Sequence, residues 1–383
     1  MRKRILAFLK KETVLCVSLA LAFGSMFLVP PDREYVEYID FRILAILFCL
    51  MCVMAGLQKI GAFDWIAGKL LGHVGSGRSL IVTLVLLCFF SGMIITNDVA
   101  LITFVPFTFI VLNMLEGEQK EKLVLPIIVL QTIAANLGSM LTPVGNPQNL
   151  YLYGKAGLSV LEFVMLMLPY TVFSLILLTG FSLLVGRACP QAFKLGGASI
   201  EELPKGRKAA SSLAVYIVLF ILCLLSVGRI LPWQVVLLAV AVLVSATDWH
   251  IFTKVDYSLL FTFTGFFVFV GNVGRIPAFR DFLQNVIAGR EIYTAVIVSQ
   301  IISNVPAALL LSGFTEDFAG LIVGTNLGGL GTLIASMASL ISYKHVARRM
   351  SGCKGKYLIL FTAANLFFLA LLILLDIIMR INA

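Results

Sequence analysis

Uncharged stretches long enough to cross a lipid bilayer follow one another along most of the chain. A crossing needs about 20 largely apolar residues, and a charge at its centre costs roughly 2.5 kcal/mol or more, so these stretches are predicted membrane spans. The predicted full spans are 13–31, 43–58, 123–154, 163–186, 209–228, 230–247, 257–274, 318–343 and 357–375. The pattern therefore predicts an all-α polytopic membrane protein with about nine full spans.

Two further uncharged regions predict hairpins that enter the membrane and return to the same side. Runs 79–97 and 99–115 are separated only by Asp98, and each is also long enough to span the membrane fully, an alternative that leaves both ends cytoplasmic. Run 292–315 is too short for two spans and is interrupted by Pro306. If it returns to the outer face, most of the 29 Lys and Arg residues lie on cytoplasmic segments, as is usual for membrane proteins. The same bias predicts a cytoplasmic N-terminus and an external C-terminus.

The two halves of the chain carry the same order of segments in opposite orientation. Each half has two spans, a surface stretch, a hairpin, a broken span and a final span. This order predicts an inverted-topology repeat, which is typical of secondary transporters. The first repeat is 1–186 (hairpin 79–115, broken helix 123–154), the connection 187–229 is a cytoplasmic linker plus one span, and the second repeat is 230–383 (hairpin 292–315, broken helix 318–343).

Both broken spans contain a Gly- and Asn-rich interruption, at 136–149 and 324–332. Non-helical backbone at membrane depth is tolerated only where protein buries it or it lines a water-filled cavity. Interruptions that recur in both halves point to a binding site between them. The predicted substrate-binding residues are Thr96, Asn97, Asp98, Thr142, Pro143, Asn146, Pro147, Ser303, Asn304, Val305, Thr325 and Asn326.

The chemistry of these segments favours an anion accompanied by a cation. Helix N-termini attract anionic groups, whereas carbonyls at a break suit Na⁺. Because the uncharged stretches contain no Lys or Arg, helix ends and co-bound Na⁺ or H⁺ would balance an anionic substrate. Asp98 is open to three interpretations: a Na⁺ ligand, a proton carrier or a helix cap.

Composition excludes most other classes of protein. With 60% hydrophobic and 13% charged residues, the chain has no room for a soluble catalytic domain. The net charge of +9 is better explained by cytoplasmic loops than by nucleic-acid binding. The seven Cys residues form no disulfide framework and the three His residues form no cluster, so we expect neither an enzyme nor a protein with a cofactor other than its coupling ion.

Three motifs carry a resemblance to a known group of transporters: Thr96-Asn97-Asp98-Val99-Ala100, Gly145-Asn146-Pro147-Gln148-Asn149 and Ser303-Asn304-Val305-Pro306-Ala307. The chain resembles, over nearly its whole length, the ion-transporter clan of citrate transporters, divalent anion:sodium symporters, arsenite permeases and one group of sodium/proton antiporters. The motifs are specific for the clan and weak for the substrate. The resemblance implies an elevator mechanism, a homodimer and a place in the plasma (inner) membrane.

In the dicarboxylate symporters of this clan each hairpin tip reads Ser-Asn-Thr. The third position is Asp98 in the first tip here and Val305 in the second, which argues against a dicarboxylate. By analogy with the clan, Asn97 and Asp98 with the Gly145 break form one Na⁺ site, and Asn304 with the Gly328 break forms the other.

The function predicted from the sequence is secondary active transport of a small, carboxylate-like anion coupled to Na⁺ or H⁺. The alternatives are sodium/proton antiport and arsenite-type oxyanion efflux. The predicted partners are the small anion, the lipid bilayer and a second copy of the chain, without nucleic acid.

Overall fold

The computed structural model describes residues 12–72, 74–112, 118–187 and 207–382, and within these ranges all regular structure is helical. Seven helices in the described ranges are long and apolar enough to cross a membrane. The prediction of an all-α polytopic membrane protein is therefore confirmed. The helices are α2 (Thr13–Met26), α3 (Glu34–Tyr38), α4 (Phe41–Lys59), α5 (Ala62–Leu71), α6 (Gly77–Ile95), α7 (Asn97–Leu112), α8 (Glu118–Ser139), α9 (Pro147–Ala156), α10 (Val160–Gly186), α11 (Arg207–Val227), α12 (Trp233–Asp248), the 3₁₀ helix η1 (Trp249–Lys254), α13 (Tyr257–Gly274), α14 (Pro277–Ile287), α15 (Glu291–Ile302), α16 (Asn304–Leu311), α17 (Phe318–Leu327), α18 (Met337–Arg349), the 3₁₀ helix η2 (Ser351–Cys353) and α19 (Lys354–Ile381).

The long runs of the sequence form two kinds of element. Six of the predicted spans are single long helices: α4, α10, α11, α12, α13 and α19. Run 123–154 divides into α8 and α9, and run 318–343 divides into α17 and α18. Span 13–31 is shorter than predicted, because α2 has 14 residues and ends before Pro30 and Pro31, which cannot continue a helix.

Local polar residues determine where several helices begin. Asp40 accepts a hydrogen bond from the backbone amide of Ile43 (3.0 Å) and so caps α4. Ser159 and Glu162 form a reciprocal capping box at the start of α10. These caps separate continuous apolar sequence into elements with defined ends.

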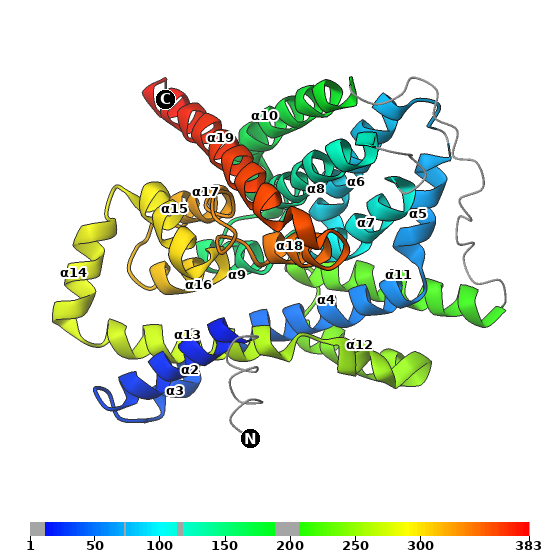
Figure 1. The fold of residues 1–383 in the computed structure, drawn as a ribbon. Helices are drawn as coiled ribbons and strands as arrows, with labels where there is room; N and C mark the ends of the chain where they lie inside the picture. The colour runs from blue at the N-terminus through cyan, green and yellow to red at the C-terminus, as the bar shows by residue number, and fades with distance from the viewer. Residues whose placement is uncertain (1–11, 73, 113–117, 188–206, 383) are drawn as a thin grey trace.

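The helices pack in two groups (Figure 1). The scaffold group consists of α2, α3, α4, α11, α12 and α13, in which α13 packs on α2, and α4 packs on α11 and α12. The hairpin group consists of α5 to α10 and α14 to α19. In it, α6 lies against α7, α8 and α10, while α15 lies against α16 and α17. Thus each hairpin packs against the first part of its own broken helix.

Two ion pairs join helix ends that are predicted to lie on the same side of the membrane as each other. Lys59 and Asp248, both predicted to be cytoplasmic, form an ion pair. Arg275 and Asp32, both predicted to be external, form another at 2.7 Å. The predicted cytoplasmic N-terminus (1–11) and most of the charged linker (188–206) lie outside the described residues.

Candidate functional site

The first hairpin reverses direction at Thr96, between α6 and α7. Thr96 has φ 74°, an uncommon value for a residue with a side chain, and hydrogen bonds of the next residue hold the backbone in this conformation. The backbone amide of Asn97 donates to the carbonyl of Gly145 (3.1 Å), and its side-chain amide donates to Oδ1 of Asn136 (3.0 Å). Asn97 Oδ1 accepts from the backbone amide of Asp98 (2.9 Å). The tip is thereby attached to the interruption between α8 and α9.

The second hairpin tip has the same geometry. Ser303 has φ 76°, close to the value at Thr96. The backbone amide of Asn304 donates to the carbonyl of Ala335 (2.9 Å), and Asn304 Oδ1 accepts from the backbone amide of Val305 (3.0 Å). The sequence therefore places a Thr-Asn-Asp tip and a Ser-Asn-Val tip in equivalent backbone conformations, each attached to its own break.

The two breaks contact each other through hydrogen bonds that form matching pairs. Asn146 Nδ2 donates to Asn326 Oδ1 (3.2 Å), and in the reverse sense Ser336 Oγ donates to Asn136 Oδ1 (3.1 Å). By these bonds Asn136 in the first break is equivalent to Asn326 in the second, and Asn146 is equivalent to Ser336, at the same offset along the chain.

A second pair of bonds repeats this correspondence. Asn326 Nδ2 donates to Asn149 Oδ1 (2.6 Å), and Asn136 Nδ2 lies 3.5 Å from its acceptor, Ser339 Oγ. Asn149 and Ser339 are separated by the same offset as the pairs above. The contacts therefore relate the two breaks by one common offset, while the inverted repeat in the membrane stays a prediction.

Close backbone approach explains two of the glycines at the first break. A Cβ on Gly138 would lie 1.9 Å from the carbonyl oxygen of Phe89, on the hairpin arm α6. A Cβ on Gly145 would lie 2.0 Å from the carbonyl oxygen of Ser139. A side chain at Gly138 would separate α6 from α8, and one at Gly145 would open the turn that follows Ser139 within the break.

Three of the other predicted residues contribute to the frame of the site. Thr142 Oγ1 donates to the carbonyl of Met93 (2.5 Å), which ties the first break to α6. Pro147 is the first residue of α9, where its missing amide costs no hydrogen bond. Pro143 is buried within the first break.

Two predicted residues, Thr325 and Gly328, make contacts that were not part of their predicted roles. The Thr325 hydroxyl donates to the carbonyl of Leu321 in its own helix (2.7 Å). Gly328 lies at the C-terminus of α17, where its carbonyl accepts from Gln300 Nε2 (3.0 Å), whereas the backbone partner of Asn304 is Ala335. The counterpart of Gly145 at the second break is thus Ala335, and Gly328 corresponds to Gly138.

Sequence reasoning missed several polar residues of this centre. The contacts between the breaks involve Asn136, Asn149, Ser336 and Ser339. The two serines lie beyond Thr332, where the second break was predicted to end. Aligning the two breaks at their common offset would have identified the two serines. Gln148 is 1% exposed, and its Nε2 and Oε1 have no hydrogen-bond partner in the described chain. An unsatisfied buried amide is costly, so Gln148 is the buried amide of the first break that has unused hydrogen-bonding capacity.

The electrostatics of the centre come from helix ends and one carboxylate. Helices α7, α9, α16 and α18 begin at the tips and breaks, whereas α6, α8, α15 and α17 end there. Asp98 is partly buried in the first turn of α7, and its carboxylate makes no ion pair within the described residues. No group of three or more His, Cys, Asp or Glu side chains that could hold a metal ion occurs in the described ranges. The arrangement offers amide and hydroxyl groups, positive helix N-termini and a single negative charge.

Membrane-length helices combined with two attached hairpins and two touching breaks define a polytopic membrane transporter. A model of the citrate transporter family matches residues 5–320. The chain is 34% identical to the uncharacterized transporter MJ0456 of Methanocaldococcus jannaschii over 284 residues (73% of this chain, 74% of that one). It is 31% identical to the inner membrane protein YbiR of Escherichia coli K12 over 327 residues (84% of each chain). The protein therefore belongs to the citrate transporter family, and it is a transporter and not an enzyme.

A more distant similarity covers part of the chain. It is 24% identical over 189 residues to a protein of rice (Oryza sativa) named silicon efflux transporter LSI3, which amounts to 48% of this chain and 38% of that one. The resemblance inferred from the three motifs is confirmed at the level of the family.

Proposed function

We propose that the protein is a secondary active transporter that moves a small, oxygen-rich anion of carboxylate-like chemistry together with Na⁺ or H⁺. The observation that carries this proposal is the meeting of both hairpin tips with both breaks, around polar groups that include no Lys or Arg. The positive dipole ends at the starts of α7, α9, α16 and α18 suit an oxyanion. The carbonyl ends of α8 and α17 suit a cation.

The proposed cation positions follow from the carbonyls and amides of the two halves. One position uses Asn97, Asp98 and the carbonyl region of Gly145, which the Asn97 amide contacts directly. The other uses Asn304 and the second break, including Gly328 and the Ala335 carbonyl. A cation bound beside Asp98 would cancel the one negative charge that otherwise repels an anion.

A neutral oxyacid is the second candidate substrate, and Asp98 favours it. The equivalent residue of the second tip is the apolar Val305, so the site as a whole has a surplus of negative charge. A solute without charge would meet no repulsion there. The similarity to a protein named silicon efflux transporter points in the same direction.

We further propose an elevator motion in which the hairpin group carries the solute past the scaffold group of a homodimer. In this proposal the N-terminus is cytoplasmic and the C-terminus external, as the distribution of Lys and Arg predicts. The name of the relative, inner membrane protein YbiR, supports the inner membrane as the location. The contacts between the tips and their own breaks support this motion, because they make each half of the site a connected unit.

Counterflow in proteoliposomes tests these proposals. Purified protein is reconstituted and offered labelled citrate, succinate, acetate, phosphate, boric acid, silicic acid and arsenous acid, each with and without Na⁺ and across a pH gradient. We expect saturable uptake of at least one carboxylate that depends on Na⁺ or on pH. Uptake of only the uncharged oxyacids would replace the first candidate by the second.

Two other results would contradict both candidates. If added Na⁺ collapses a pH gradient without any solute, the protein is a sodium/proton antiporter. If no solute of the panel is transported under any gradient, transport of small oxygen-rich solutes is excluded for the reconstituted protein.

A further inference from the structure

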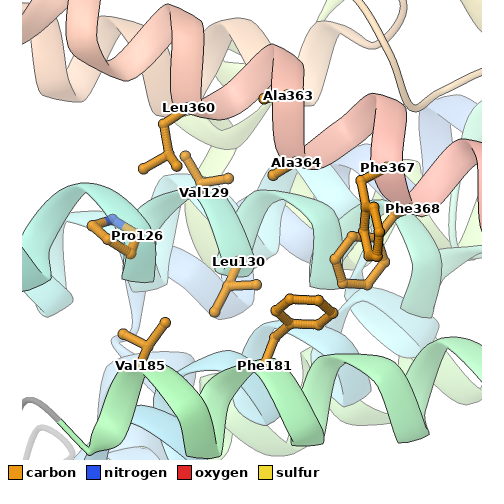
Figure 2. A pocket seen from close by; sticks show the side chains of 10 residues that line it. All are labelled: Pro126, Val129, Leu130, Phe181, Val185, Leu360, Ala363, Ala364, Phe367 and Phe368. Atoms are coloured by element: carbon orange, nitrogen blue, oxygen red, sulfur yellow. The ribbon is translucent and has the colours of Figure 1, made fainter.

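An apolar groove lies between α10 and α19 on the outside of the hairpin group. Its volume is about 290 Å³, and α8 forms its floor. Figure 2 shows Val129 and Leu130 of α8 between Phe181 and Val185 of α10 on one side and Leu360 of α19 on the other. The flanking faces of α10 and α19 are apolar and exposed, so in a bilayer the groove opens towards acyl chains.

A second groove of about 390 Å³ runs along the outer face of α10. It passes Gly180, where an added Cβ would have no atom within 4 Å. Phe181 lines both grooves and stands between them. The second groove ends at Arg187, the first residue of the linker.

Basic side chains gather where both grooves end. Arg187 lies two residues beyond Val185, or about 3 Å further along the chain direction of α10. Arg78 packs against the same helix end, because a Cβ on Gly186 would lie 2.8 Å from Arg78 Cγ. Lys356 is exposed one turn before Leu360 on the antiparallel helix α19.

These three basic side chains share two further properties. None forms an ion pair within the described residues. All three lie on the side of the membrane that is predicted to be cytoplasmic.

We propose that these grooves and the basic end together bind one anionic phospholipid of the cytoplasmic leaflet. Its two acyl chains lie on either side of Phe181, and its phosphate lies between Arg78 and Arg187. Guanidinium groups match phosphate oxygens through paired N–H donors. Basic pockets between transmembrane helices on the cytoplasmic side are suited to anionic headgroups. Neither the tips nor the breaks take part in this site.

Native mass spectrometry of the full chain in mild detergent tests the proposal. The protein is titrated with phosphatidylglycerol and with phosphatidylethanolamine that have the same acyl chains. We expect the wild-type chain to retain phosphatidylglycerol about tenfold more tightly. Arg78→Gln/Arg187→Gln should reduce that affinity to the level of phosphatidylethanolamine. Arg280→Gln/Arg290→Gln is the matched control, because it removes the same charge at the predicted external side and should leave the preference intact.

Gly180→Leu tests the acyl-chain part independently. The side chain fills the second groove, so retention of both lipids should fall together, while Gly24→Leu, another glycine with open space around its Cβ, should change neither.

Equal retention of the two lipids by the wild-type chain would overturn the proposal, as would an unchanged preference in the double Arg variant. Displacement of phosphatidylglycerol by millimolar inorganic phosphate would mean a free-anion site instead. Retained binding of phosphatidylethanolamine shows that an Arg variant is folded. If the double Arg variant does not fold, Arg187→Gln alone is tested in its place.

Discussion

Asparagine side chains supply most of the polar contacts at the two tips and breaks. An amide has two donors and an acceptor with two lone pairs, so one residue can bridge several segments. Asn136 does so with Asn97, Ser336 and Ser339. Because these groups are buried, each hydrogen bond that is lost leaves a partner without water to replace it. The asparagine amides therefore hold the two tips and the two breaks together. The amide of Gln148, in the first break, takes no part in these contacts.

Asn136→Ala should be strongly destabilising. It removes three inter-segment contacts and leaves the Asn97 amide unsatisfied, at a cost of about 2–4 kcal/mol. Tryptophan-monitored thermal unfolding in detergent measures the loss, and counterflow measures transport. Asn365→Ala is the control: Asn365 is equally buried but donates only within its own helix, to Phe361 (2.8 Å), so its loss should cost about 1 kcal/mol. Equal destabilisation by the two changes would contradict the bridging role.

Asp98→Asn should separate coupling from solute binding. The change keeps the side-chain shape and removes the single carboxylate of the site. We expect driven uptake to fall roughly tenfold or more, whereas counterflow of the solute, which needs no net cation movement, persists. Asp281→Asn, on the exposed surface of α14, should alter neither. Full cation dependence in Asp98→Asn would leave Asp98 with the role of a helix cap.

The hairpins and broken helices depend on backbone features that the sequence indicated well. The predicted hairpin 79–115 corresponds to α6 and α7, and 292–315 corresponds to α15 and α16. Gly and Pro interrupt a helix through local sterics, and this effect is visible in the sequence. The contribution of Ser336 and Ser339 was not predictable in this way, since serine is ordinary in a helix and gains its role only from the opposite break.

Gly138→Ala should disturb the packing of α6 against α8. The new methyl group would overlap the Phe89 carbonyl oxygen, which belongs to a rigid helix, so relief requires a backbone shift that costs about 1–3 kcal/mol. A lower melting temperature and reduced counterflow are the expected results. Gly24→Ala, in open space on α2, should be neutral or slightly stabilising because alanine has the higher helix propensity. A melting temperature of Gly138→Ala equal to that of the wild type would show that α6 moves away from α8 at little cost in free energy.

At the level of the whole molecule, few polar contacts between described residues join the scaffold group to the hairpin group. One of them involves Arg229, between α11 and α12. Its Nη1 donates to the Gly157 carbonyl (3.4 Å) and its Nη2 to the Gly154 carbonyl (3.5 Å). Its guanidinium also lies 5.4 Å from the centre of the Tyr153 ring. These contacts hold the C-terminal end of α9 to the scaffold group.

Arg229→Gln should shift the balance between the two transport states. If the hairpin group moves past the scaffold group, this exposed contact breaks, and its loss should destabilise the state described here by about 1 kcal/mol, or roughly fivefold in population. One cysteine is introduced at Gly157 in one variant and at Lys254 in another. The rate at which each is labelled from either side of the membrane reports the change in population of the two states. Arg280→Gln, whose ion pair with Asp281 stays within α14, is the control. Unchanged labelling in Arg229→Gln would argue against relative motion at this contact.

The sequence by itself determined the class of protein and indicated where the chain turns at both tips and where both interrupted helices break. These features follow from the hydrophobic effect and from backbone sterics, which act over one helix length and are visible in a window of residues. Only the tertiary structure decided which residues of one break contact the other, that Ala335 and not Gly328 corresponds to Gly145, and that Arg78 lies beside the end of α10. Such pairings depend on the distances and directions of side chains from segments far apart in the chain, and no local pattern encodes them.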